Sequence, residues 1–379
     1  MRVCLIRGLL DSPSIIRYGN DLVRNLHAYH SEIEVAETKP PSPSLLPIGR
    51  IGRGVATHLI RYGWYPVRVR AIRSDVNHIA DHLHAYLIRH LQAQRTIVTC
   101  HDLTTFVHPE NINSRSLFPS ITERAYQHSI NVLHEATCVI AVSENTRKDI
   151  LTYSRCTPEQ VRVIYHGIDT IFHEEKDREK VLAFRRRFAP TGSRLLLHVG
   201  LTTPYKNIES VLRAVHVLST DMGQDVRLIK VGQEFTASQK RLIRDLGLSD
   251  RIIHLSKLEP EDLVVCYQSC DVLLFPSVYE GFGWPPLEAM SCGTPVVAST
   301  TGSIPEIVGD AAILEEPTDV RKLAQAVAGV LGDEELRKRL ISAGLRRARL
   351  FTWQRSISQL VGIYEDISRL ALSDDRHAD

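Results

Sequence analysis

The chain has 379 residues, a near-neutral formal charge of +2 and the composition of a soluble globular protein. This length is too great for one ordinary core and fits two domains of middling size. Because the charges nearly cancel and both signs are scattered along the chain, we expect no nucleic-acid binding. The seven cysteines form no Cys-x-x-Cys pair, which argues against disulfides and a zinc site and indicates a reducing compartment.

The sequence also argues against a membrane span, a signal peptide and a metal site. No apolar run is long enough to cross a bilayer, and Met1–Arg7 reads as a first strand rather than a signal peptide. We therefore expect a cytoplasmic protein. The sequence has no His-Glu-x-x-His or Asp-x-Asp spacing, so we expect no bound metal.

The first half alternates short apolar runs with longer amphipathic segments, a pattern typical of a parallel sheet covered by helices. A loop containing Pro13 precedes the first expected helix, and the Pro/Ser-rich residues Pro40–Pro47 are expected to form a surface loop. The expected strands are Val3–Ile6, Val76–Ala80, Thr96–Thr99, Cys138–Val142 and Val161–Tyr165, and the expected helices are Tyr18–His27, Ala85–Leu91, Ser116–Ala136 and Glu144–Leu151, the last with Ser143 as N-cap.

The segment Arg50–Arg73 is apolar and basic and contains no acidic residue. Residues 1–100 contain thirteen Lys or Arg against seven Asp or Glu, a local excess of six positive charges. Such a basic amphipathic stretch can lie on an anionic membrane surface. It can equally be a solvated helix face that uses Trp64 and Tyr65 to complete the core, and the sequence leaves both interpretations open.

His101 follows the expected strand Thr96–Thr99 directly. The carboxyl ends of parallel strands are where open α/β sheets bind ligands, so His101 is a candidate site residue. A lone histidine is more often structural, and the position and neighbours of this one favour a functional role.

A charge-dense segment, Glu174–Arg187, is expected to link two repeats of the same alternation. The second half opens with a strand over Leu195–Gly200, which runs into a turn that carries Lys206 and Asn207. The further expected strands are Val226–Val231, Ile252–Leu255 and Val272–Phe275, and the expected helices are Val320–Leu331, Glu334–Arg349 and one from Trp353 to about Leu370.

The most informative stretch runs from Phe275 to Val297, where a buried strand leads through a glycine-interrupted loop into a helix. Pro285 and Pro286 suit the first helical turn, which has no use for their missing N–H groups. Gly281 and Gly283 allow close approach of a ligand to the backbone, and the free N–H groups of the helix start favour an anion. Two carboxylates accompany this anion site: Glu280 on the loop and Glu288 about one turn inside the helix, both expected to face one crevice and to accept hydroxyl groups.

The Glu-x7-Glu element with its Gly-Phe-Gly core resembles the retaining glycosyltransferases of family GT4, which have the GT-B fold. His101-Asp-Leu, His166-Gly-Ile-Asp169 and the Lys206-Asn207 turn resemble further segments of that family. The chain departs from the family pattern at Ser14 and Ile16, where two glycines are expected. It also departs at Leu201 or Thr202, where an Arg is often found. The resemblance covers nearly the whole chain after residue 70.

The resemblance implies two doubly wound Rossmann-like domains with a cleft between them: an acceptor-binding domain over 1–172 and a nucleotide-sugar-binding domain over 190–351. A C-terminal helix over 352–379 is expected to pack back on the first domain. It further implies that Glu280 and His101 act at the transferred hexose, that Lys206, Gly281, Phe282 and Gly283 bind the donor with its diphosphate, and that Glu288 binds the ribose.

The function that we expect is retaining transfer of a hexose from GDP-mannose or UDP-glucose to a saccharide or lipid-linked acceptor, in glycan or polysaccharide biosynthesis. No cofactor or metal is expected, the leaving diphosphate helping to deprotonate the acceptor. We expect the enzyme to be cytoplasmic, with peripheral contact to the inner face of an anionic membrane as one reading of Arg50–Arg73. The alternatives are an inactive nucleotide-sugar-binding scaffold and another GT-B enzyme, such as an inverting transferase or an epimerase.

Overall fold

The computed structural model describes residues 1–9, 12–42, 50–108, 119–175, 177–189 and 192–375. Most of the expected loop Pro40–Pro47 and the first three residues of the expected helix Ser116–Ala136 lie outside these ranges. The chain divides into two compact units, which are described separately: unit 1 comprises Met1–Gly167 and Trp353–Asp379, and unit 2 comprises Ile168–Thr352.

Unit 1 contains a six-stranded sheet in the order β2-β1-β3-β4-β5-β6, with every pairing parallel. The strands are β1 Arg2–Ile6, β2 Glu34–Thr38, β3 Val76–Ile79, β4 Thr96–Cys100, β5 Cys138–Ala141 and β6 Val161–Val163. The helical segments are α1 Pro13–Tyr29, α2 Arg50–Leu59, the π-helical turn η2 Ile60–Trp64, α3 Tyr65–Val69, the 3-10 segments η3 His82–His90, η4 Ala93–Arg95 and η6 Leu133–Glu135, α4 Thr104–Val107, α5 Pro119–Asn131, α6 Glu144–Tyr153 and α15 Trp353–Asp375.

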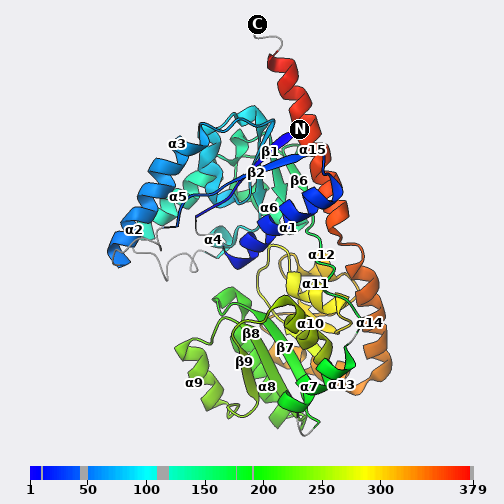
Figure 1. Cartoon of the computed structure of the whole chain (residues 1–379). Helices are drawn as coiled ribbons and strands as arrows, with labels where there is room; N and C mark the ends of the chain where they lie inside the picture. Colours follow the sequence, from blue (N-terminus) through cyan, green and yellow to red (C-terminus); the bar gives the residue numbers. More distant parts are fainter. Residues whose placement is uncertain (10–11, 43–49, 109–118, 176, 190–191, 376–379) are drawn as a thin grey trace. The chain divides into compact units, whose positions relative to one another are not determined.

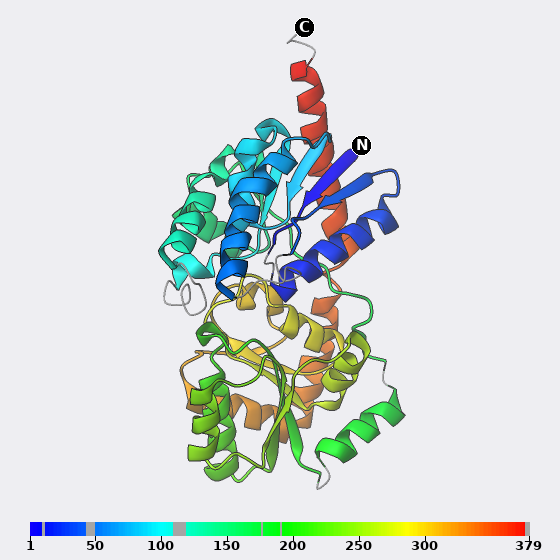
Figure 2. The same ribbon diagram turned by 60° about the vertical axis from the view of Figure 1, so that its left-hand side comes forward.

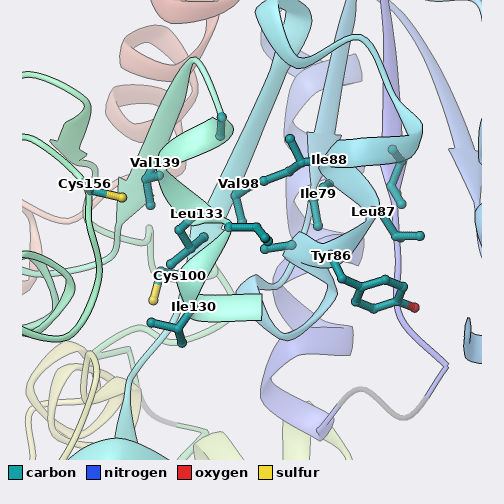
Figure 3. Close-up of a cluster of buried hydrophobic side chains, with 14 of the residues drawn as sticks. Ile79, Tyr86, Leu87, Ile88, Val98, Cys100, Ile130, Leu133, Val139 and Cys156 are labelled. Carbon is teal, nitrogen blue, oxygen red and sulfur yellow. The ribbon is translucent and has the colours of Figure 1, made fainter. Parts of the chain in front are cut away.

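Helices cover both faces of this sheet (Figures 1 and 2). One face packs against α3, η3 and α5 and forms a large apolar core, part of which Figure 3 shows around Val98, Cys100 and Leu133. The other face carries α1 and α15, which contact each other along the side of the unit. Parallel strands covered on both faces are buried throughout and are mostly apolar, and β4 is buried at all five positions.

Unit 2 repeats this design with a second parallel sheet in the order β12-β11-β10-β7-β8-β9. The strands are β7 Arg194–Gly200, β8 Val226–Gly232, β9 Ile252–Leu255, β10 Val272–Phe275, β11 Val296–Ser299 and β12 Ile313–Glu315. The helical segments are α7 Arg178–Phe188, η7 Pro204–Lys206, α8 Ile208–Thr220, α9 Ala237–Asp245, α10 Pro260–Ser269, α11 Trp284–Ser291, α12 Ile304–Val308, α13 Val320–Gly332 and α14 Glu334–Ala348.

The strand order of unit 2 reverses between β7 and β10. From β7 the chain proceeds through β8 to β9 on one side, and β10, β11 and β12 then build the sheet on the other side. In open α/β sheets, ligands bind outside the carboxyl ends of the strands at such a switch point. The α/β class with two doubly wound sheets, as expected from the sequence, is thus confirmed.

The chain passes between the units twice, at one place. Ile168 forms a bridge with Thr352 and donates its N–H to the carbonyl of Phe351 at 3.0 Å. A Cβ on Gly167 would collide with the backbone nitrogen of Trp353, so this crossing requires glycine. The final helix, α15, belongs to unit 1, where Ile357, Leu360, Val361 and Tyr364 are buried.

Two local expectations were wrong. Helix α1 begins at Pro13 rather than near Tyr18, because Ser12 caps it and Pro suits its first turn; Ser14 and Ile16 are therefore helical rather than part of a loop. The segment expected to be a linker, Glu174–Arg187, mostly forms α7. Asp177 accepts the N–H of Lys180 at the N-terminus, and three arginines end the helix, so the charges complement its dipole.

Among the residues that the structure describes, no helix combines the length and the apolar character needed to span a membrane.

Candidate functional site

The candidate site of unit 2 lies at the switch point of its sheet, where the turn after β7 meets the loop after β10. The N–H of Val278 donates to the carbonyl of Tyr205 at 2.8 Å, which joins the two segments. Asn207 adopts a left-handed conformation, with φ of 54°. Its side-chain amide donates to the carbonyls of Pro276 and Pro317 at 3.0 and 2.7 Å, which holds the turn against the loop.

Lys206 and Glu280 meet at the centre of this site. The ammonium of Lys206 donates to Oε1 of Glu280 at 2.6 Å, and both side chains are largely buried, with exposed fractions of 13% and 10%. The ammonium also lies 5.5 Å from the centre of the Phe275 ring. Lys206 and Glu280, which the sequence analysis assigned to different parts of the donor, are therefore direct partners in this structure. Since a buried charge is costly without its partner, removing either side chain would leave the other uncompensated.

The loop from Glu280 to Gly283 is shaped by the segment after β11. A Cβ on Gly302 would stand 2.8 Å from the backbone nitrogen of Glu280, so only glycine allows this approach. Ser303 fixes the loop from the same side, since its N–H donates to the carbonyl of Glu280 at 3.2 Å and its hydroxyl to that of Phe282 at 2.7 Å. These contacts hold both ends of the loop against the segment after β11.

Helix α11 begins at Trp284, one residue before the expected Pro285, with Gly283 as its N-cap at φ of 106°. A residue with a side chain would be strained there. Pro285 and Pro286 follow Trp284 and favour a helix start at this point. Among the described residues, no side chain caps the helix. Backbone N–H groups and the helix dipole at this end favour a bound anion.

Glu288 lies inside α11 and is almost completely buried. Its Oε2 accepts a hydrogen bond of 2.7 Å from the hydroxyl of Tyr267 on α10. The position about one turn into the helix agrees with the expectation from the sequence. The partner Tyr267 was not foreseen, because nothing in the spacing of α10 singles out its hydroxyl.

Sequence reasoning also missed Lys230, a fully buried lysine on β8. Its ammonium donates to the carbonyl of Gly200 at 2.9 Å and to that of Gln233. Burial lowers the pKa of Lys230 to about 8. A signal was present, because a lysine in an otherwise apolar strand, Val226–Gly232, has to satisfy its charge inside the protein.

His101 belongs to unit 1, where it follows β4 as expected. Its Nε2 lies 2.9 Å from the carbonyl oxygen of Ala80, so Nε2 carries the proton and Nδ1 keeps a lone pair. Burial lowers the pKa of His101, which keeps the imidazole neutral near pH 7. The ring makes an edge contact with Tyr18 at 4.7 Å between centroids and lies 5.5 Å from His166.

A second histidine of unit 1, His78, was not singled out from the sequence. Its Nδ1 lies 2.6 Å from the Tyr364 hydroxyl and its Nε2 2.7 Å from the Thr99 hydroxyl, which also contacts the hydroxyl of Tyr18 at 3.0 Å. Burial lowers the pKa of His78 to about 3. It lies on the buried strand β3, which the sequence predicted without indicating these partners.

No set of three or more His, Cys, Asp or Glu side chains within the described residues is arranged to hold a metal ion. What the site of unit 2 does offer is a cation, a carboxylate and a helix N-terminus around one loop. The cation and the helix start suit a phosphate, and the carboxylate suits a hydroxyl group.

The two halves of the chain match two family descriptions. Residues 18–172 match "Glycosyltransferase Family 4", and residues 179–347 match "Glycosyl transferases group 1". Together the matched ranges include both candidate regions, with His101 in the first and the loop from Glu280 to Glu288 in the second.

Relatives of the chain among characterised proteins are named as glycosyltransferases, in agreement with the two family matches. The chain is 34% identical over 238 residues to the MMP alpha-(1->4)-mannosyltransferase of Mycolicibacterium hassiacum, covering 62% of this chain and 55% of the relative. It is 28% identical over 298 residues to the O-antigen chain mannosyltransferase B of Escherichia coli, covering 78% and 76%. The match thus spans only about half the length of the first relative.

Solved structures match along almost the whole chain. The sucrose-phosphate synthase of Thermosynechococcus elongatus superposes with a TM-score of 0.76 at 22% identity, covering 97% of this chain and 98% of that one. Anabaena HepE in complex with UDP-glucose gives 0.70 at 19% identity, covering 98% and 100%. At such low identity the likeness establishes the fold. From the two family matches and this fold, the chain belongs to the family 4 glycosyltransferases of the GT-B fold.

Proposed function

We propose that the protein transfers a hexose from a nucleoside diphosphate sugar to a saccharide or lipid-linked acceptor in glycan biosynthesis, with retention of configuration and without a metal. The observation that carries the proposal is the pairing of Lys206 with Glu280 at the switch point of unit 2, beside the N-terminus of α11. The mannosyltransferase relatives favour GDP-mannose as the donor, and the UDP-glucose complex of HepE keeps UDP-glucose as the second candidate.

Lys206 is the group that we assign to the diphosphate. Before the donor binds, Glu280 compensates its charge at 2.6 Å. A diphosphate carries more charge than one carboxylate, so it can attract the ammonium and leave Glu280 available for the hexose hydroxyls. As the glycosidic bond breaks, negative charge grows on the leaving diphosphate. Lys206 and the backbone N–H groups near Gly281 to Gly283 would stabilise it.

The roles of Glu288 and His101 are assigned from the family resemblance. Glu288 binds the ribose, held in orientation by Tyr267. We assign His101, as a neutral imidazole, to the hexose. A neutral ring suits this task better than an imidazolium, because a positive charge beside a developing oxocarbenium ion would be repulsive.

Binding and transfer together test the proposal. Isothermal titration with GDP, UDP, GDP-mannose and UDP-glucose identifies the donor, and a ligand at ~100 times its Kd raises the stability of the fold by about 2.7 kcal/mol in a thermal-shift assay. Transfer is then measured with mannose-terminated and lipid-linked acceptors in the presence of a chelator, and NMR assigns the anomeric configuration of the product. Donor binding without transfer to any acceptor would favour an inactive scaffold, and an inverted product would favour an inverting transferase.

For the acceptor, the surface of α2, η2 and α3 favours a lipid-linked substrate at the inner face of an anionic membrane. Leu59 and Val67 are exposed at 66% and 65%, and Trp64 at 47%. On a continuous α-helix the eight-residue spacing of Leu59 and Val67 would separate them by about 80°. The π-helical turn Ile60–Trp64 takes up one extra residue and brings them back to one side. Exposed Arg68 adds positive charge beside this apolar stripe.

Vesicle sedimentation tests this contact. Binding to vesicles with anionic lipid should exceed binding to neutral vesicles and should weaken with added salt, because salt screens the arginines. Leu59→Ser with Trp64→Ser should abolish it, whereas the matched change of exposed Leu182→Ser on α7 should not. Equal recovery with neutral and anionic vesicles would identify the stripe as a solvated helix face.

A further inference from the structure

Lys230 lies beneath the turn that carries Lys206. It is on β8, in register with His198 on β7, and the two strands end at Gly200 and Gly232, which are also in register. The ends are in close contact, because a Cβ on Gly232 would stand 2.5 Å from the carbonyl oxygen of Gly200. The ammonium of Lys230 binds that same carbonyl.

The contacts of Lys230 tie two loops together. Besides Gly200, its ammonium binds the carbonyl of Gln233 in the loop after β8. That loop is joined to the Lys206 turn by the N–H of Thr202, which donates to Oε1 of Gln233 at 3.2 Å, and by the Thr202 hydroxyl, which donates to the carbonyl of Glu234 at 3.3 Å. Lys230 therefore determines where both carbonyls point.

Lys230 differs from Lys206 in the charge of its hydrogen-bond partners, and this difference gives it an electrostatic role besides its structural one. The charge of Lys206 is compensated by Glu280, whereas both described partners of Lys230 are uncharged carbonyl oxygens. The carboxyl ends of strands present carbonyl oxygens, which repel an approaching phosphate. An ammonium bound to two of them reverses the sign of the potential at this point, and its effect is strong because the surroundings are of low polarity.

We propose that Lys230 is a positioning residue for the donor diphosphate: it holds the carbonyls of Gly200 and Gln233 away from the phosphates and supplies, beneath the Lys206 turn, the positive charge that Glu280 does not compensate. This proposal rests on the function proposed above.

The test compares ligands with and without phosphates. Lys230→Met keeps most of the side-chain volume and removes the charge. Lys230→Gln also removes the charge but can still donate to one carbonyl, so it keeps the test valid if the Met variant folds poorly. Isothermal titration measures the affinity for the nucleoside diphosphate and for the matching nucleoside, with Lys257→Met, an exposed lysine of unit 2, as the control. The quantity of interest is the ratio of the affinity for the nucleoside diphosphate to that for the nucleoside. Loss of a purely structural contact would leave this ratio unchanged.

Both Lys230 variants should bind the nucleoside diphosphate at least roughly tenfold more weakly, as expected for the loss of a charge-assisted contact, while nucleoside affinity changes by less than about threefold. The control should match wild type for both ligands. Equal weakening for both ligands would reduce Lys230 to a structural tie, and unchanged diphosphate affinity would remove it from the site; either result overturns the inference. Failure of the wild-type protein to bind any nucleotide would instead refute the proposed function itself.

Discussion

The two units have sheets of the same size and direction, yet they bury polar groups in different ways. Near His101, unit 1 buries neutral imidazoles, His78 between two hydroxyl groups and His101 on a carbonyl, alongside a buried ion pair of Asp81 with His82 at 3.0 Å. At the candidate site of unit 2, the buried groups are charged, with Lys206 on Glu280 and Lys230 on two carbonyls. Neutral hydrogen-bonding groups suit an uncharged sugar, whereas buried cations suit a diphosphate. If the proposed function holds, one architecture supports two kinds of recognition, according to the polar groups that it buries.

The largest expected effect comes from removing the cation of unit 2. Lys206→Ala should lower kcat/KM for the donor roughly 100-fold, about 3 kcal/mol, because the growing charge of the leaving diphosphate loses its partner. Steady-state transfer at non-saturating donor measures this. Lys338→Ala, an exposed lysine on α14, is the control and should transfer at the wild-type rate. A wild-type rate for Lys206→Ala would mean that the charge in unit 2 serves the fold alone.

The two glutamates should separate into different kinetic classes. Glu280→Gln should lower kcat roughly 30-fold, about 2 kcal/mol, even at saturating donor, because its interactions change as the glycosidic bond breaks. Glu288→Gln should chiefly raise the donor KM, because the ribose does not react; its amide oxygen can still accept from Tyr267, which protects the fold. Circular dichroism checks folding of both. The reverse pattern would place the donor the other way round in the site.

Acid should destabilise unit 1 through its buried, neutral His78. The folded pKa of His78 is about 3, against about 6.5 in an unfolded chain, so unfolding takes up a proton between these values. The stability contributed by the neutral ring is complete above pH 6.5 and is lost as the pH falls. Between pH 7.5 and 5.5, His78 alone should lower the free energy of unfolding by about 1.4 kcal/mol.

Urea unfolding measures this in a Trp284→Phe background, where the remaining tryptophans, Trp64 and Trp353, both report on unit 1. The matched variant His78→Gln cannot titrate and should show a correspondingly smaller loss between the two pH values. If the two proteins lose stability equally, the pKa of His78 is not depressed in the fold.

The smallest expected effect concerns the hydroxyl that holds His78 to the last helix. Tyr364→Phe removes the 2.6 Å contact with Nδ1 and should lower the free energy of unfolding of unit 1 by about 1 kcal/mol. The same urea experiment measures it. Tyr153→Phe, at an exposed ring on α6, should have no effect. An unchanged free energy of unfolding for Tyr364→Phe would show that water can replace the hydroxyl.

The sequence was most informative where backbone geometry is dictated by residue type. The glycines and prolines of residues 281–286 predicted the loop and the start of α11 to within one residue, because few other residues adopt those conformations. The strand Val272–Phe275 was predicted with its observed bounds, since a buried parallel strand is an uninterrupted apolar run.

Contacts between distant segments could not be predicted in this way. The pairing of Lys206 with Glu280 spans 74 positions, and that of His78 with Tyr364 spans 286. Neither follows from local spacing, because the strand order brings the partners together. The prediction of a linker over Glu174–Arg187 was wrong for a different reason. Its many charges indicate exposure, which an exposed helix and a linker share. The capping residue Asp177 distinguishes the two, because it marks a helix start.

The membership of α15 in unit 1 affects the order in which the protein can fold during synthesis. Unit 2 is uninterrupted in sequence, from Ile168 to Thr352, and has all its strands once those residues have left the ribosome. Unit 1, although translated first, lacks one of the two helices on one face of its sheet, α15, until Trp353 and the residues after it emerge. The half that begins the chain is thus the last to be completed. Until then its uncovered apolar face is a natural target for chaperones.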